Sequence, residues 1–239
     1  MKKLIQLNSL IISVLILSGC LFPQDQRGAQ DVPYEDQRVA VENAVHEYRE
    51  VTGVLPIETR EQDTPEFRRY PVNFKELNPY LSQLPVNAFE NGGVYQYVIL
   101  NPEEEMDVRL LDIRTSRAIQ EIQRSIYQYR SDNTYAPVKE IVHEGLMQPD
   151  YNALQYDEEI TVQSPFYPDH RLPVYMETDG SLIVDYRIDI MKVIEEEGAD
   201  DYEPGDDLRY LLTDHHPVVP DYSYPMTMND DGEIIFKEN

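Results

Sequence analysis

One pattern occurs twice in this sequence and restricts how each copy can fold. Apolar side chains are spaced four and then three residues apart, which is the spacing of one face of an α-helix. An arginine follows the last of them directly, and a proline follows seven residues later. Because a helix with one apolar face must cover another apolar surface, each copy predicts a helix packed on a sheet. The pattern comprises Val41, Val45, Tyr48, Arg49 and Pro56 in the first copy, and Ile122, Ile126, Tyr129, Arg130 and Pro137 in the second.

Each predicted helix is followed by a residue suited to a C-terminal cap. Gly53 and Asn133 are the residue types that most readily adopt the left-handed backbone conformation that ends helices. The residue before each proline is then expected to be extended. Short helices or turns are predicted further along the chain at 73–85, 137–149 and 206–217, each of them before an apparent hairpin.

Turn residues between alternating arms predict three antiparallel hairpins. Asp179-Gly180 and Asp231-Gly232 separate such arms, and Asp-Gly is among the strongest short-range hairpin signals. Asn101-Pro102 takes the same place in the first unit. The segments VRLLDI and YRIDI appear at corresponding places and are expected to lead into the next helix. The residues from Ile188, IDIMKVIEEE, are predicted to form the leading helix of a third unit.

These patterns predict an α+β fold made of tandem units, each with a helix, a short helix and an antiparallel hairpin. We expect the units at 35–113, 114–187 and 188–239, with the third one truncated. The chain is acidic and has a mean hydropathy of −0.54, but its 18 tyrosines, six phenylalanines and regularly spaced aliphatic residues are enough for a core. Since the chain has one cysteine, that core must be stable without disulfides.

The N-terminal residues have the layout of a secretory signal. Lys2 and Lys3 precede a mostly apolar run that is too short and too interrupted to span a bilayer. Leu17, Ser18, Gly19 and Cys20 then resemble the lipobox of bacterial lipoproteins. That resemblance implies a signal peptide at 1–19, recognised by its peptidase through the three residues before the cysteine. It also implies acylation of Cys20, and residues 20–34 are predicted to form a flexible tether.

Composition limits the partners of the exported body. The formal charge is −25, and it becomes −27 once the leader with its two lysines is removed. So acidic a body repels nucleic acid, because few cations are available to displace the counterions of the phosphates. We therefore expect attachment to the membrane through the lipid, on the extracytoplasmic face of the cell membrane, and no nucleic-acid partner.

Part of the chain resembles a known kind of globular domain. The stretch from Tyr70 to Ile99, YPVNFKELNPYLSQLPVNAFENGGVYQYVI, is similar to the globular half of type IV pilins and pseudopilins. The lipobox stands where a pilin has its assembly helix, so this chain should not polymerise as a pilus. Over its full length the chain resembles YphF-type lipoproteins of Gram-positive spore-formers. Some of those are labelled substrate-binding proteins of ABC transporters.

One segment is similar to a calcium-binding loop. In TMNDDGEIIFKE, residues 227–238, Asn229, Asp231 and Glu238 fall at positions 3, 5 and 12 of such a loop. Position 1 is Thr227, which lacks the expected carboxylate, and a plain Asp-Gly hairpin explains the same residues. The hairpin is our preferred interpretation, and no metal site is predicted.

Other polar motifs do not assemble into a recognisable catalytic set. The acidic segment 200–207 has the composition of a solvated loop, although hard cations bind weakly to such loops. His215-His216 has no third ligand nearby in the sequence, and Ser181 lies in a predicted hairpin rather than in a nucleophile elbow. The abundant tyrosines suggest either an adhesive face or half-buried positions in sheets and helices, and we favour the second.

The sequence therefore predicts a membrane-anchored, non-enzymatic lipoprotein without a cofactor, which binds an envelope protein or acts as a scaffold. The alternative is a solute-binding lipoprotein of an ABC transporter, whose small-molecule ligand the sequence does not identify. A two-lobed binding protein needs parallel βαβ units with continuous apolar strands, whereas the predicted strands alternate and pair through hairpins.

The lipobox prediction has a direct test. Changing Cys20→Ala removes the thiol that would carry the lipid, so the protein should leave the membrane fraction or keep its leader. Cell fractionation and gel mobility measure both effects. Unchanged fractionation together with unchanged mobility would contradict the lipoprotein prediction.

Overall fold

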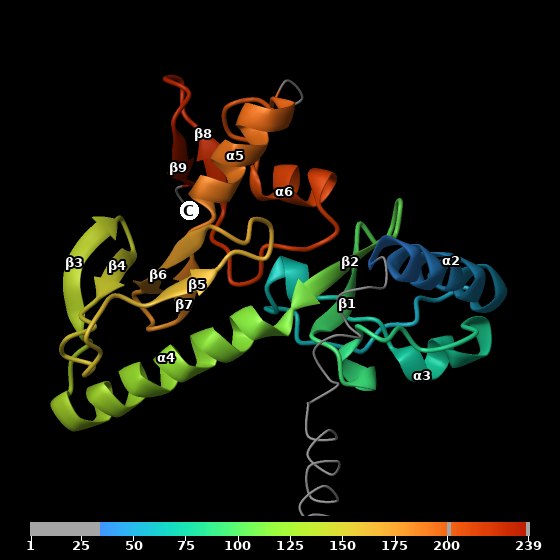
Figure 1. Cartoon of the computed structure of the whole chain (residues 1–239), viewed down its shortest axis with the longest axis horizontal. Helices are drawn as coiled ribbons and strands as arrows, with labels where there is room; N and C mark the ends of the chain where they lie inside the picture. Colours follow the sequence, from blue (N-terminus) through green and yellow to red (C-terminus); the bar gives the residue numbers. More distant parts are fainter. Residues whose placement is uncertain (1–33, 200–201, 238–239) are drawn as a thin grey trace, which may run out of the picture. The chain divides into compact units, whose positions relative to one another are not determined.

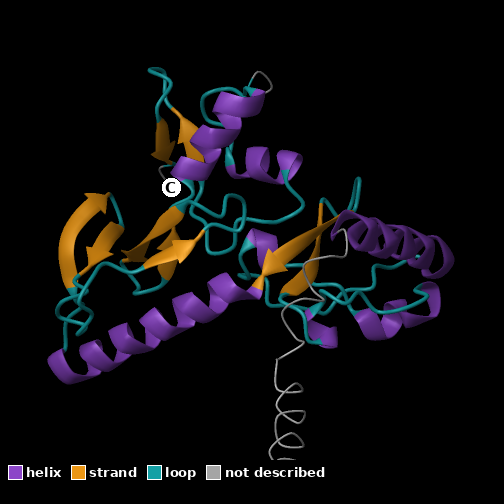
Figure 2. Ribbon diagram, viewed as in Figure 1, coloured by secondary structure: helices purple, strands orange, loops and turns teal. Residues whose placement is uncertain are grey.

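The computed structural model describes residues 34–199 and 202–237, and the chain from Glu35 onward forms one compact unit. Helices alternate with antiparallel hairpins along it (Figure 1), and Figure 2 shows how the two kinds of element are distributed. The predicted α+β class is confirmed. The predicted leader, the lipobox and Cys20 lie outside the described residues. Within the described ranges, no helix is long and apolar enough to cross a membrane.

The first part of the chain places a long helix beside a two-stranded sheet. The apolar face of the helix is buried, with Val41 and Val45 fully inaccessible to solvent. The helix ends at the predicted cap, where Gly53 has a φ of +76° and donates its N–H to the carbonyl of Arg49 at 2.8 Å. The elements are α2 (Tyr34–Thr52), η3 (Glu66–Arg68), α3 (Phe74–Leu77), η4 (Asn78–Tyr80), η5 (Phe89–Asn91) and the antiparallel pair β1 (Tyr95–Leu100) and β2 (Asp107–Asp112).

The second part repeats the helix and adds a larger sheet. Ile122 and Ile126 are buried as predicted, but the cap is Thr134, with a φ of +64°, and not Asn133. The sheet has the order β3-β4-β6-β5, and β7 also pairs with β6. The elements are α4 (Ile113–Asn133), β3 (Val138–His143), β4 (Leu146–Pro149), β5 (Thr161–Gln163), β6 (Arg171–Glu177) and β7 (Leu182–Val184).

The short helix predicted at 137–149 is wrong, because this segment forms the β3–β4 hairpin. Val138, Ile141 and Val142 are β-branched and favour an extended backbone. Gly145 supplies the positive φ, +77°, at the turn between the strands. A turn that resembles α3 follows the hairpin instead, at 150–154.

The third part is a smaller version of the same arrangement. Its helices lie where they were predicted, and the hairpin turns at Gly232, which has a φ of +80°. The third strand pair is antiparallel, with Met226 opposite Phe236. The elements are α5 (Arg187–Glu197), α6 (Arg209–His215), β8 (Met226–Met228) and β9 (Ile234–Phe236).

Hydrogen bonds at corresponding positions are consistent with a repeat in the first two parts. Arg49 donates to the carbonyl of Pro102 at 2.7 Å, and Arg130 donates to the carbonyl of Asp179 at 3.0 Å. Each helix is thus tied to the turn of the hairpin that it covers. The carbonyls of Pro56 and Pro137 likewise accept the N–H groups of Asn73 and Asp150, at 2.7 and 2.8 Å.

Three helices begin on the same Asp-x-Arg motif. In each case the carboxylate accepts the backbone N–H of the arginine two residues later, and this bond satisfies one free N–H at the helix start. The same carboxylate also binds the guanidinium of that arginine. The predicted correspondence of VRLLDI with YRIDI is therefore wrong, because YRIDI already belongs to the start of α5. The motifs are Asp112-Ile113-Arg114, Asp185-Tyr186-Arg187 and Asp207-Leu208-Arg209.

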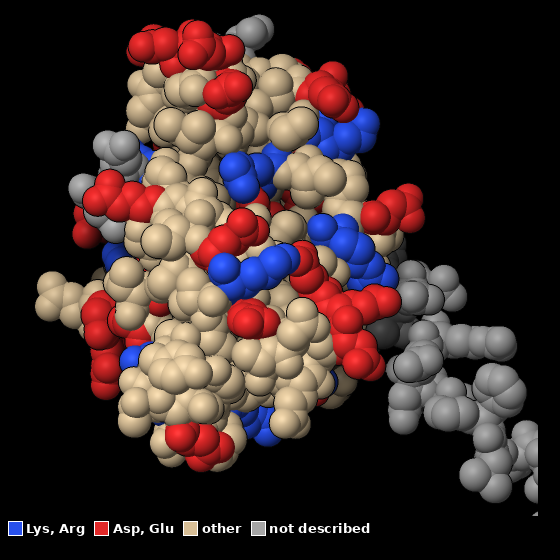
Figure 3. Space-filling model, turned by 90° about the vertical axis from the view of Figure 1, so that its left-hand side faces the viewer, with Lys and Arg blue, Asp and Glu red and all other residues tan. Residues whose placement is uncertain are grey.

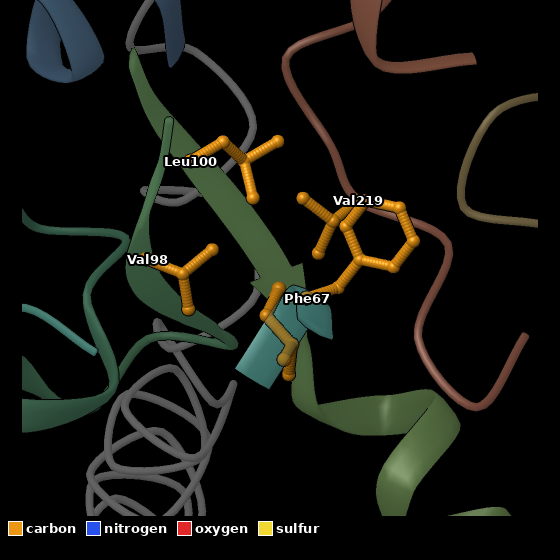
Figure 4. Packing of buried hydrophobic residues seen from close by; sticks show 5 residues of the cluster. Phe67, Val98, Leu100 and Val219 are labelled. Carbon is orange, nitrogen blue, oxygen red and sulfur yellow. The ribbon is translucent and has the colours of Figure 1, made fainter. Parts of the chain in front are cut away.

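One segment, 217–223, joins the parts of the body. It lies beside β2, where Leu110 donates to the carbonyl of Pro217 at 2.8 Å and accepts from the N–H of Val219 at 2.9 Å. Further along, the carbonyl of Tyr222 accepts the N–H of Val184 in β7 at 2.8 Å. The Val219 side chain packs into an apolar cluster (Figure 4) formed with Phe67, Val98, Leu100 and Leu111.

Asp221 lies in the middle of this segment and is 2 % exposed. Its carboxylate binds the guanidinium of Arg68 through both oxygens and accepts from the Ser116 hydroxyl at 2.8 Å. The carbonyl of Asp221 accepts from the Tyr186 hydroxyl at 2.8 Å. The Arg68 guanidinium also lies 4.0 Å from the centre of the Tyr222 ring. All three predicted units therefore meet at one buried carboxylate.

Asp221→Ala should lower the free energy of unfolding by about 3 kcal/mol, because it leaves the partly buried Arg68 guanidinium without its counter-charge. Asp63→Ala is the control, since Asp63 is exposed. Chemical denaturation of both variants measures the difference. Equal stability of the two variants would show that the pair does not hold the parts together.

Candidate binding groove

An apolar groove lies between α5 and the β8–β9 hairpin, with β6 at its base. Its volume is about 1040 Å³. Figure 1 shows the hairpin running alongside α5, and β9 contacts the helix. Three large apolar side chains in the groove are open to solvent: Ile188 is 44 % exposed, Met191 52 % and Ile235 36 %. The remaining apolar lining comes from Pro173, Ile194, Met228 and Ile234.

The groove exists because α5 is apolar on two faces. Ile190 and Val193 point into the body and are buried, whereas Ile188 and Met191 are three residues apart and share the opposite, exposed face. A helix that is apolar all round is normally enclosed on all sides. The outer face of α5 is instead covered only by the edge of the neighbouring hairpin, which leaves apolar surface in contact with water.

A buried carboxylate fixes the position of α5. Asp189 is fully inaccessible, and it accepts from the Ser164 hydroxyl at 2.8 Å while its other oxygen lies 2.6 Å from Nδ1 of His170. The Ser164 hydroxyl also accepts two backbone N–H groups, from Phe166 and Tyr167. Ser164 is therefore a structural link and not an activated nucleophile, because it bonds to the carboxylate and not to the histidine.

The base of the groove is held by a paired arginine. Arg187 binds Asp185 at 2.6 Å, and its guanidinium lies 4.4 Å from the centre of the Phe236 ring. Phe236 also contacts the rings of Tyr175 and Tyr224 edge-on. This packing connects the first turn of α5 to β9 and keeps the two walls of the groove at a fixed separation.

The charges in the groove are separated along the axis of α5. Arg171 lies beside the first turn, because its neighbour His170 bonds to Asp189 and Pro173 accepts the N–H of Asp185. Among the described residues, the Arg171 side chain has no ion-pair partner. Glu195 lines the groove two turns further along the helix. The groove therefore has Arg171 at one end and Glu195 at the other, with apolar residues between them, and its other charged lining residues are Glu233 and the paired Arg187 and Asp185.

The structure places the calcium-loop residues in an ordinary hairpin. The amide oxygen of Asn229 accepts the backbone N–H groups of Asp231 and Glu233, at 3.0 and 2.8 Å, so it closes the turn. Glu238 lies outside the described residues. No cluster of three or more metal-binding side chains occurs among the residues that the structure describes.

The other polar motifs lie apart from the groove. His216 packs against Phe166 and Tyr167, and burial lowers its pKa. His215 is exposed, and Ser181 bonds to Glu177 and Asp179 within its hairpin. In the acidic segment 200–207, the described carboxylates of Asp206 and Asp207 accept hydrogen bonds from their own loop and from Arg209.

Most of the described tyrosines are buried or half-buried. Tyr95, Tyr97, Tyr186 and Tyr224 are buried and most of the other described tyrosines are half-buried, in agreement with the preferred interpretation. Tyr127 is an exception, with 58 % of its surface exposed. Figure 3 shows acidic side chains scattered over one face of the molecule, with the visible basic groups close to acidic ones.

Sequence reasoning found α5 and the third hairpin but missed the groove between them. The available signal was IDIMKVI, where five of seven residues are apolar, which is more than one buried face of a helix accommodates. The consecutive Ile234 and Ile235 in β9 gave the same signal, because adjacent residues of a strand point to opposite faces. Neither signal shows which apolar residues the rest of the body leaves uncovered.

The comparison with protein families supports a YphF-like family. Residues 34–112 match the YphF family N-terminal domain. The match ends at Asp112, where β2 ends and α4 begins. The groove lies in the part of the chain beyond the matched residues. No curated protein and no solved structure was found to match the chain.

The anchor of α5 predicts a pH dependence of stability. Burial raises the pKa of Asp189. Hydrogen bonds from His170 and Ser164 favour the charged form and lower this pKa, but the effect of burial is larger. The folded protein therefore keeps this proton at pH values at which the unfolded chain has released it. The contribution of Asp189 to the free energy of unfolding should decrease as pH rises from the ordinary aspartate pKa through the raised one.

Asp189→Asn has no such proton and keeps an oxygen that can accept from Ser164. The stability of the wild type relative to this variant should therefore be greatest at acidic pH and fall towards neutral pH. Urea denaturation of both proteins across this range measures the difference. A difference in stability that is constant with pH would rule out a raised Asp189 pKa.

Proposed function

We propose that this chain is a lipid-anchored lipoprotein on the extracytoplasmic face of the cell membrane, whose body binds protein through the groove beside α5. The observation that carries this proposal is the exposure of Ile188, Met191 and Ile235 on a single surface. Exposed apolar side chains that gather in a groove with charged ends are typical of protein-binding surfaces.

The openness of the groove favours a protein over a small solute. A small-molecule site usually encloses most of its ligand's surface. Here the side chains that would contact a ligand remain about half exposed at Met191 and Ile188. The groove volume of about 1040 Å³ is at the upper end of the range for ligand pockets, which is the one feature that favours the solute-binding alternative.

The sequence supports the anchor in this proposal. Cys20 is the only cysteine, and it stands directly after an apolar leader with Gly19 before it. Two or more acyl chains on one cysteine hold a protein stably on a membrane, whereas a single chain does so only marginally. Confinement to a membrane also raises the effective concentration of any partner in the same membrane, so a groove of modest affinity suffices for binding.

The polar clusters of the described residues support binding rather than catalysis. Their carboxylates are used to start helices at Asp112 and Asp185, to join segments at Asp221 and to anchor α5 at Asp189. These groups have structural partners in each case. We therefore propose a role as a binding or scaffold protein of the cell envelope.

Charged substitutions in the groove should abolish this binding and leave the fold intact. Ile188→Glu and Met191→Glu each place a carboxylate in a surface that must become dry on binding, which costs at least about 2 kcal/mol. Crosslinking in intact membranes, followed by affinity purification, should recover a protein partner with the wild type and at least about tenfold less of it with either variant.

Tyr127→Glu is the matched control, because Tyr127 is exposed on α4 and does not line the groove. It should recover as much partner as the wild type, and thermal unfolding should show all four proteins folded. Equal recovery with the groove variants would contradict the proposed function. If the purified wild type instead carried a small apolar molecule that the groove variants lack, the solute-binding alternative would be correct.

A further inference from the structure

We infer that the occupant of the groove is a second copy of this chain, with the two α5 helices packed antiparallel about a two-fold axis. This inference rests on the proposed function, because it takes the groove as a protein-binding surface and names the partner. It is carried by the shape of the groove and by the order of the charges along it.

The shape of this surface allows it to pair with itself. The helix α5 forms one wall of the groove and also a ridge, since Ile188 and Met191 project from it into solvent. In a two-fold dimer the same patch is used on both subunits, and residue i of one copy meets residue j of the other. The ridge of each α5 can then enter the partner's groove, which covers both sets of exposed apolar side chains at once.

The charges of the two copies are complementary in this antiparallel arrangement. Arg171 lies beside the first turn of α5 and Glu195 near its end. The helix rises about 12 Å from Arg187 to Glu195, at about 1.5 Å per residue. Reversing the direction of one helix brings the basic end of each groove to the acidic end of the other. A parallel arrangement would instead bring like charges together at both ends.

The helix ends give a second, independent reason. Arg187 begins α5 and Glu195, Glu196 and Glu197 end it, and its last turn contains no basic residue. Three carboxylates are unfavourable at the end of α5, because the C-terminus of a helix carries a partial negative charge. Lys192 pairs with two of these glutamates, at 3.7 and 3.1 Å, and offsets the effect only in part. An antiparallel partner supplies the missing cation, because its Arg171 lies beside the glutamates.

The net charge of the body opposes association of two copies at low ionic strength. This repulsion acts over a distance and is largely screened at about 0.15 M salt, where the Debye length is about 8 Å. Direct ion pairs at the ends of the groove are screened less. The dimer should therefore be measured at physiological salt.

Charge reversal tests the two-fold arrangement. We expect the full-length protein in a non-ionic detergent to sediment as a dimer, and Arg171→Glu or Glu195→Arg alone to raise the dissociation constant about tenfold or more. Each substitution creates two like-charge pairs, because the interface is symmetric. An equimolar mixture of the two variants should form a heterodimer as tight as the wild-type dimer, since both of its charged pairs are again opposite.

Arg117→Glu and Glu121→Arg are matched controls on the exposed surface of α4, and they should dimerise like the wild type. A wild type that is monomeric at every concentration, or a mixture of the two groove variants that is no tighter than either alone, would overturn the inference.

A photo-crosslinking amino acid at position 191 of the full-length chain, in intact membranes, separates this inference from the proposed function. Adducts between two copies of α5 support both. Adducts only with a different protein overturn the second copy as occupant and leave the groove as a protein-binding site. The absence of any protein adduct overturns both.

Discussion

The buried carboxylate of Asp221 is the contact on which the arrangement of the body depends. It binds Arg68 from the first predicted unit and Ser116 at the start of α4, while its own segment leads into the third hairpin. Its carbonyl accepts from Tyr186 at the start of α5. A charge that is removed from water must be paired, so the three segments can approach one another only in the geometry that completes these bonds.

The position of the groove depends on these contacts of Asp221. Tyr186 precedes α5 directly and donates to the backbone carbonyl of Asp221, and the chain after Asp221 becomes β8, so contacts of one residue position both walls. Asp189 then fixes the rotation of α5 through Ser164 and His170. With Asp189, Ile190 and Val193 turned inward, helix geometry leaves Ile188 and Met191 outside. The exposed apolar face is thus a consequence of buried polar contacts.

The local elements of the fold could be predicted because their causes are local. The spacing of Val41 and Val45, the Gly53 cap and the Asp-Gly turns each depend on a few neighbouring residues. The segment 137–149 was predicted wrongly as a short helix or turn, because it was likened to 73–85, whereas its β-branched residues favour the strands that it forms. The cap at Thr134 was missed because threonine seldom adopts a positive φ.

The candidate site could not be predicted in the same way. Arg68 and Asp221 are 153 positions apart, and nothing in either neighbourhood indicates that they pair. The apolar residues of α5 were visible, but which of them would be covered depends on the long-range contacts of Asp189 and Tyr186. The family comparison covers residues 34–112 and so adds nothing about this surface.

The oxidation rate of Met191 in the membrane-anchored protein shows whether a partner covers the groove. A methionine that is half exposed is oxidised quickly by dilute peroxide, whereas one enclosed in an interface is protected. Mass spectrometry can compare its oxidation rate in intact membranes with that in highly diluted, purified protein. A protein-binding groove predicts slow oxidation in the membrane and fast oxidation after dilution. Equally fast oxidation in both would show that nothing covers the groove in its native setting.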